Sequence, residues 1–189
     1  MSLSLDTRQG WPAELLFLLE RHPRATWPAQ RSVGVQFWLE VHDHFRRDCV
    51  GLEMAADDHR AGRTSVAQLA VIAAPRLRGL IAGLKGHHQI EDFHYFPAFR
   101  RHEPRLTAGL EALERDHEEL QSDVNAALAA LGELRAAAER ATGHDVASTL
   151  ALAANRYIDV TARLCRRLCR HLSDEEDLVI PLLVERGDY

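Results

Sequence analysis

Apolar side chains recur at every third or fourth position along most of the chain, whereas the alternation typical of strands is scarce. We therefore predict an all-α protein. Long helices are expected over residues 31–60, 75–100, 104–139 and 145–186, with a turn at 141–148. The stretch 65–74 is also helical in character, but Pro75 is expected to interrupt it. Long helices joined by short links favour an antiparallel up-down four-helix bundle.

The first 30 residues do not belong to this series of long helices. They contain one short apolar helix around PAELLFLLER, residues 12–21, in a segment that Pro12, Pro23 and Pro28 punctuate. We expect residues 1–30 to form an N-terminal helical extension and residues 31–189 to form the bundle domain.

A histidine lies within the apolar stripe of each predicted long helix. The stripe runs through the histidine at a spacing of three or four residues in every case: Trp38–His42, Leu84–His87, Leu113–His117 and Leu168–His171. Two of the helices add a glutamate one turn further along, Glu91 and Glu175. Polar side chains therefore converge on the interior from all four helices.

The two glutamate-bearing helices share one spacing. His87 and Glu91 lie ten and six residues before Pro97, and His171 and Glu175 lie ten and six residues before Pro181. Each glutamate is also followed directly by another acid, Asp92 or Glu176. Such a repeat indicates that the two helices have the same chemical role.

Metal binding explains these interior residues better than a hydrogen-bonded polar core. A carboxylate without a partner inside an apolar core costs several kcal/mol or stays protonated. Two divalent cations would be bound by the neutral imidazoles and bridged by the carboxylates. The approximate twofold repeat predicts that each metal receives two histidines and a share of both glutamates. Positions for a small ligand would remain open.

Three further histidines are alternatives or neighbours of the predicted ligands. His44 lies about 200° around the helix from His42 and cannot share its direction. His88 has its own acid four residues on, so a register with His88 and Asp92 as ligands is the alternative to His87 and Glu91. His94 lies seven residues beyond His87 on the same face, where it could line a ligand channel, hydrogen-bond to a ligand from outside the coordination sphere, or lie at the surface.

The four motifs resemble the hemerythrin-like, or HHE cation-binding, proteins. The resemblance covers about residues 35–185, in the order VHDHFRR, HHQIEDFHYFP, LERDHEEL and HLSDEEDLVIP. It implies a non-haem centre of two iron ions that binds O2 or a related small ligand, with zinc or manganese as possible substitutes. The ligands that it implies are His42, His87, Glu91, His117, His171 and Glu175.

The chain departs from the oxygen-carrying members in two places. Those proteins have two histidines four residues apart on the third helix, whereas Leu113 and Gln121 flank His117 here at that spacing. We therefore expect one histidine fewer, which argues against reversible O2 carriage. The extension at residues 1–30 is also more than a minimal bundle needs, and we expect it to cover one end of the bundle.

Composition narrows the partners. A net charge of -5 argues against binding to nucleic acid, and no uninterrupted apolar run or signal peptide is evident, so no membrane partner and a cytoplasmic location are expected. The cysteines, Cys49, Cys165 and Cys169, are expected to be free.

The expected function is the binding of O2, NO or peroxide for sensing or protection. The alternatives are a metal-dependent peroxidase or NO reductase, and a metal-handling or regulatory bundle. No nucleophile or general base accompanies the metal ligands in the sequence, so a small-ligand binding protein is favoured over a dedicated enzyme.

Overall fold

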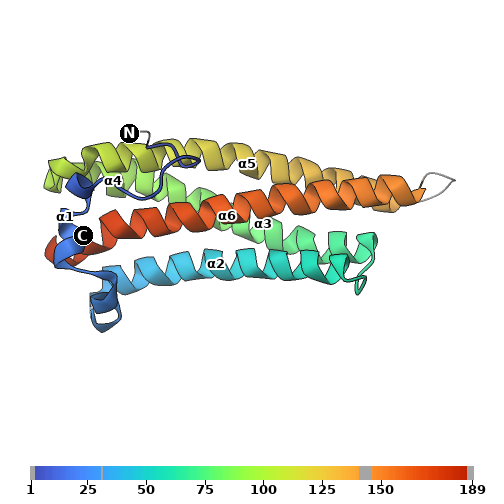
Figure 1. Cartoon of the computed structure of the whole chain (residues 1–189), viewed down its shortest axis with the longest axis horizontal. Coiled ribbons are helices and arrows are strands. Elements are labelled where there is room, and N and C mark those ends of the chain that lie inside the picture. The colour runs from blue at the N-terminus through green and yellow to red at the C-terminus, as the bar shows by residue number, and fades with distance from the viewer. Residues whose placement is uncertain (1–2, 31, 141–145, 187–189) are drawn as a thin grey trace. The chain divides into compact units, whose positions relative to one another are not determined.

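The computed structural model describes residues 3–30, 32–140 and 146–186. Within them the protein is all-helical, as predicted, and its long helices form a bundle preceded by short N-terminal helical segments (Figure 1). The predicted turn at 141–148 falls mainly on residues outside the described ranges. The long elements are α2 (Val33–Arg60), α3 (Val66–Ile90), α5 (Thr107–Glu139) and α6 (Val146–Arg186).

The chain divides into two compact units, and the long helices contribute to both. The first unit comprises residues 1–44, 86–118 and 167–189, and the second unit comprises residues 45–85 and 119–166. All of the predicted metal ligands belong to the first unit.

Local sequence explains how α2 ends and α3 begins in the second unit. Gly62 adopts a positive φ of 72° after α2, a conformation that glycine reaches without strain. At the start of α3, the hydroxyl of Ser65 accepts from the backbone N–H of Gln68, and the amide oxygen of Gln68 accepts from the N–H of Ser65. This reciprocal pair satisfies two N–H groups that a helix terminus leaves without partners.

The predicted break at Pro75 is wrong, because α3 passes through Pro75 without interruption. A proline inside a helix removes the hydrogen bond to the carbonyl four residues earlier, here that of Val71. Pro75 and Val71 both lie on the exposed side of α3, where water can solvate that carbonyl. The buried side keeps its leucines and alanines, so packing outweighs the lost bond.

The N-terminal segment of the first unit consists of short helices. They are η1 (Ala13–Leu15), α1 (Phe17–Arg21) and η2 (Arg24–Ala29), shown in blue in Figure 1. Leu15, Leu18 and Trp27 are buried in a core cluster of this unit together with Phe96 and Phe99. The segment is therefore part of the hydrophobic core and not a loose tail.

One helical stretch has the length and composition of a membrane span. The run Val66–His102 comprises α3, η3 (Glu91–Tyr95) and α4 (Phe96–His102). Part of it is long and apolar enough to cross a membrane, by length and composition only. No uninterrupted apolar run was expected there, but alanine and leucine around a few charges give this composition. A helix that packs into a protein core can have the same length and composition, and one face of α3 is buried. The observation therefore carries little weight by itself.

Candidate metal centre

Seven buried or half-buried side chains of the first unit form two adjoining groups. The long helices α2, α3, α5 and α6 supply six of them, and the seventh, Glu91, lies in η3. In the first group, His42, His87, Glu91 and Glu175 place one ligand atom each within 4.8 Å of one another. In the second group, His88, His117 and His171 do the same. The structure thus brings together all six residues expected from the sequence, and His88 joins them.

The two glutamates stand between the groups. Oε1 of Glu91 lies 3.0 Å from Nε2 of His87, and its Oε2 lies 3.6 Å from Nε2 of His117. Oε1 of Glu175 lies 3.4 Å from Nε2 of His42, and its Oε2 lies 3.3 Å from Nε2 of His171. Each carboxylate therefore presents one oxygen to each group, as a carboxylate that bridges two metal ions does.

Most of the atoms that face inward have no hydrogen-bond partner within the described residues. Among the described residues, no hydrogen-bond partner is found for the buried Nε2 of His42, His88, His117 and His171, for either oxygen of Glu91, or for Oε2 of Glu175. Buried polar atoms are normally hydrogen-bonded, because leaving them without partners costs free energy. Imidazole nitrogens and carboxylate oxygens are donors that iron, zinc and manganese accept. The donor set therefore fits a pair of such cations.

The two buried glutamates have pKa values that are shifted in opposite directions. Burial raises the pKa of Glu91 well above its ordinary value, and the nearby Glu175 adds to this. Burial would also raise the pKa of Glu175, but contacts with His42 and His171 hold it well below its ordinary value. A cation between the two carboxylates would favour the ionised form of both.

The histidines of the two groups also have pKa values that are shifted in opposite directions. Burial lowers the pKa of His87 to about 3, and it also lowers the pKa values of His88 and His117. Burial acts in the same direction on His171, but Asp116 and Glu175 raise its pKa to about 9. Neutral imidazoles at His87, His88 and His117 are the form that coordinates a metal.

Three of the histidines are held from behind by carboxylates. Nδ1 of His42 lies 3.0 Å from Oε1 of Glu176, Nδ1 of His117 lies 2.8 Å from Oδ1 of Asp92, and Nδ1 of His171 lies 3.2 Å from Oδ2 of Asp116. An N–H on Nδ1 that donates to the carboxylate leaves Nε2 with its lone pair for a metal. The Nε1–H of Trp38 similarly donates to Oε1 of Glu175 at 2.7 Å.

These carboxylates have a signal in the sequence. Asp92 and Glu176 directly follow the two glutamates of the cluster, and Asp116 directly precedes His117. Neighbouring residues on a helix point about 100° apart, so each acid faces the histidine of an adjacent helix. The repeated acidic pairs are visible in the sequence, but only the structure shows that they accept hydrogen bonds from histidine.

The expected twofold division of the histidines is not what the structure shows, because the second group contains three. His88 stacks on His117 with ring centroids 3.8 Å apart and an interplanar angle of 7°. The same 100° step that separates His87 from His88 directs His87 toward His42 of α2 and His88 toward His117 of α5. His87 and His88 are thus used together, whereas the sequence suggested a choice between them.

His94 does not face the interior. The helix changes to a π-helical turn, η3, at Glu91–Tyr95, and this turn accommodates an extra residue. The following interior positions are therefore Phe96 and Phe99, both 0 % exposed, while His94 is exposed beside the ring of Tyr95. His44 is exposed on α2, in agreement with the choice of His42.

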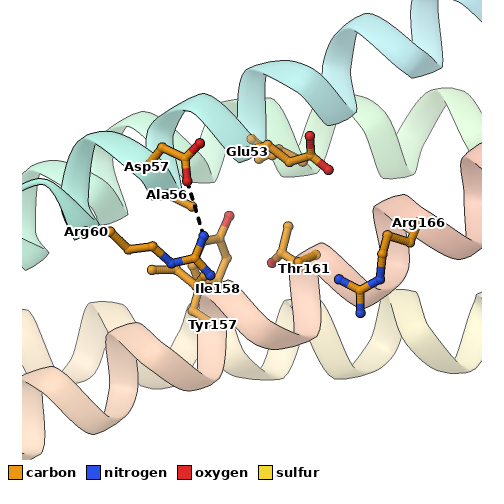
Figure 2. A pocket seen from close by; sticks show the side chains of 10 residues that line it. Glu53, Ala56, Asp57, Arg60, Tyr157, Ile158, Thr161 and Arg166 are labelled. Atoms are coloured by element: carbon orange, nitrogen blue, oxygen red, sulfur yellow. Dashed lines mark hydrogen bonds and ion pairs between the residues drawn. The ribbon is translucent and has the colours of Figure 1, made fainter.

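The second unit has a different kind of site. A cavity of about 230 Å³ lies between α2 and α6, with the hydroxyl-bearing residues Tyr157 and Thr161 in its lining (Figure 2). Both residues are buried, whereas Asp57 and Arg60 on its rim are exposed and paired at 3.2 Å. This cavity lacks the inward-facing imidazoles of the first unit and does not resemble a metal centre.

Comparison with known proteins agrees with this geometry. The family model described as the hemerythrin HHE cation binding domain matches residues 33–151. Neither a curated protein nor a solved structure gives a significant match to the chain.

Proposed function

Because the chain belongs to the hemerythrin HHE cation-binding family, we propose that its histidine–glutamate cluster holds two iron ions and binds O2, NO or peroxide for sensing or protection. The observation that supports this most strongly is the position of the two glutamates. Each has one oxygen within 3.6 Å of a histidine of either group, so both can bridge a metal pair.

The proposed ligands divide unequally between the two ions. His42 and His87 would hold one ion, and His88, His117 and His171 would hold the other, with Glu91 and Glu175 shared. The ion with two histidines keeps more of its coordination sphere open, and a small ligand would bind there. Bound iron would supply reversible one-electron chemistry and affinity for diatomic ligands. The residues of the chain supply orientation, through Asp92, Asp116 and Glu176, and exclusion of water through burial.

Iron is preferred over zinc and manganese because of the family resemblance, although the donor set suits all three. We also propose a cytoplasmic location, which is supported by the lack of a disulfide among Cys49, Cys165 and Cys169 in the described part of the chain. The seventh donor, His88, restores the histidine that the third helix was expected to lack. With five histidines in the cluster, reversible binding of O2 remains part of the proposed function.

The direct test is metal analysis of protein purified without chelators, together with its visible spectrum in air. We expect about two iron ions per chain and near-ultraviolet absorption that changes on reduction. The reduced protein is then titrated with O2, NO and peroxide. Stoichiometric binding supports the proposal, whereas sustained consumption of peroxide or NO with a reductant indicates an enzyme. Zinc or no metal after growth with ample iron would contradict it and favour a metal-handling or structural role.

A further inference from the structure

We propose that the N-terminal segment is a functional part of the metal centre, in which Arg8 and Arg24 are positioning residues for His171 and His42. Arg8 acts through the carboxylate of Asp116, and Arg24 acts through the carboxylate of Glu176. The inference rests on the proposed function, because it assigns these histidines to the metal ions. It goes beyond that function by giving a segment outside the family match a role in metal affinity.

A repeated sequence motif places the two arginines. Residues 8–12 read RQGWP and residues 24–28 read RATWP, so the pattern Arg-x-x-Trp-Pro occurs twice in the first 30 residues. In each copy the guanidinium lies over the ring of its own tryptophan, at 4.3 Å for Arg8 on Trp11 and 4.9 Å for Arg24 on Trp27. Both tryptophans are buried and therefore fixed in place. Stacking on a fixed ring restricts the arginine and presents its planar fork in a defined direction.

Arg8 is the more deeply buried of the two, with a side chain that is 0 % exposed. Its Nη2 donates to Oδ2 of Asp116 at 2.6 Å, and its Nε donates to Oδ2 of Asp174 at 2.8 Å. The remaining nitrogen, Nη1, donates to the carbonyl oxygen of Leu3 at 2.6 Å. Trp11 strengthens this arrangement, because its Nε1–H donates to the backbone carbonyl of Asp174 at 2.6 Å.

The contact between Arg8 and Asp116 reaches the metal centre directly. Oδ2 of Asp116, which accepts from Arg8, is the same atom that lies 3.2 Å from Nδ1 of His171. Held in place by Arg8, the carboxylate of Asp116 accepts from the Nδ1–H of His171 and turns Nε2 toward the cluster.

Arg24 repeats this arrangement on the other group of ligands. Its Nη1 donates to Oε2 of Glu176 at 3.3 Å, and Oε1 of the same carboxylate lies 3.0 Å from Nδ1 of His42. Two shorter bonds, to Oδ1 of Asp177 at 2.8 Å and to the carbonyl of Ser173 at 2.7 Å, hold the guanidinium against α6. The side chain is 46 % exposed and its bond to Glu176 is long, so a smaller effect is expected than for Arg8.

The third carboxylate–histidine pair shows why arginines are needed at the other two. Asp92, which faces His117, keeps 32 % of its side chain exposed and can be solvated by water. Asp116 and Glu176 are only 1 % and 3 % exposed. A carboxylate that is shielded from water costs free energy unless a donor or a positive charge lies beside it. The N-terminal segment supplies an arginine to each of these two buried acids.

The experiment measures Co²⁺ and Fe²⁺ affinity without oxygen, by competition with a chelator, in the full chain. We compare Arg8→Gln, Arg8→Lys and Arg24→Gln with the wild type. Arg21→Gln is the matched control, because Arg21 lies in the same segment and pairs with Glu185, which contacts no cluster histidine. We expect Arg8→Gln to weaken affinity by about 10- to 100-fold and Arg24→Gln by less than about tenfold, with no change for the control.

Two further readouts separate positioning from structural support. The visible spectrum of bound Co²⁺ should change in Arg8→Gln, and Arg8→Lys should restore part of the affinity, because lysine keeps the charge without the fork. A merely structural role would lower thermal stability with the spectrum of bound Co²⁺ unchanged, and that result would overturn the inference. If Arg8→Gln does not fold, the half-exposed Arg24 decides, and unchanged affinity in Arg24→Gln overturns it.

The test also distinguishes this inference from the proposed function. A wild-type chain that binds no metal pair defeats the proposed function before any variant is compared. A wild-type chain that binds about two ions, with affinity unchanged in Arg8→Gln and Arg24→Gln, leaves the proposed function intact and defeats the inference.

Discussion

The two units are built from the same long helices, but their interiors differ in chemistry. In the first unit the buried polar residues are numerous: Arg8, His42, Glu91, Glu103, Asp116, His117, His171, Asp174, Glu175 and Glu176. Within the described residues of the second unit, the buried polar residues are Asp123 and Thr161, and alanine and leucine fill most of the interior. A helix can therefore keep one apolar period along its whole length while only one part of it contributes residues to a candidate functional site.

The difference has an energetic consequence. Leucine and alanine in the second unit stabilise the fold by leaving water, and they need no partner. The buried acids and histidines of the first unit are satisfied by one another, by Arg8 and, as proposed, by metal. The cost of buried polar groups in the metal-free protein is thus larger in the first unit than in the second unit.

The largest effect that would test this difference is loss of metal from the first unit. We expect Glu175→Ala, and likewise Glu91→Ala, to lower the metal content from about two ions per chain to well below one, because both ions lose a shared ligand. Metal analysis of the purified variants measures this. Glu103→Gln is the control, since Glu103 is buried in the same unit but pairs with Arg105 and not with a histidine. An unchanged stoichiometry in both glutamate variants would contradict the site.

Metal loading should stabilise the protein and act first on the first unit. Free metal at about 1,000 times its dissociation constant stabilises a folded state by about 4 kcal/mol. We expect hydrogen exchange to slow most in residues 33–44, 86–118 and 167–186 when metal is added. Equal slowing in residues 45–85 would show that both units unfold together, which would break the comparison.

The second unit should respond to packing and not to metal. Leu134 is 0 % exposed on α5, and Leu134→Ala is expected to lower the free energy of unfolding by about 3 kcal/mol through the cavity that it leaves. Denaturant unfolding of the metal-free protein measures this, and the metal content should stay unchanged. Leu152, which is 72 % exposed, offers the control, because Leu152→Ala should change stability by less than about 0.5 kcal/mol.

The same difference between the two interiors explains how much of each unit could be predicted from the sequence. The helical period extends over the whole chain, so the fold class and the long helices could be predicted from it. The exception, Pro75, depended on which side of α3 faces solvent. The six expected site residues also lie together, because each combines an unusual side chain with a position in an apolar stripe.

What the sequence could not show depends on contacts between helices and on irregular turns. His88 falls outside a single stripe, and it is recognised only when α3 is known to face both α2 and α5. The π-helical turn at Glu91–Tyr95 has no simple pattern, and it moved His94 to the surface. Arg8 and Asp174 are separated by 166 positions, so no local pattern connects them.

The smallest effect concerns the buried hydroxyl group of Tyr157 in the second unit. No hydrogen-bond partner of its hydroxyl is found within the described residues, and burial raises its pKa to about 12. The unfolded chain ionises this group near pH 10, so between about pH 10 and pH 12 the unfolded state binds fewer protons than the folded state. The free energy of unfolding therefore falls as the pH rises through that window, by at most about 1.4 kcal/mol per unit.

Tyr157→Phe should remove this slope and leave stability at neutral pH within about 1 kcal/mol of the wild type, because only a weak contact with the hydroxyl of Thr161 is lost. Denaturant unfolding at pH 9, 10 and 11 measures the difference between the two proteins. Thr161→Val is the control, since it removes the neighbouring hydroxyl of the same cavity but keeps the phenol and its slope. If the wild type and Tyr157→Phe lose stability in parallel, Tyr157 is solvated, and the second unit is less dry than its buried residues indicate.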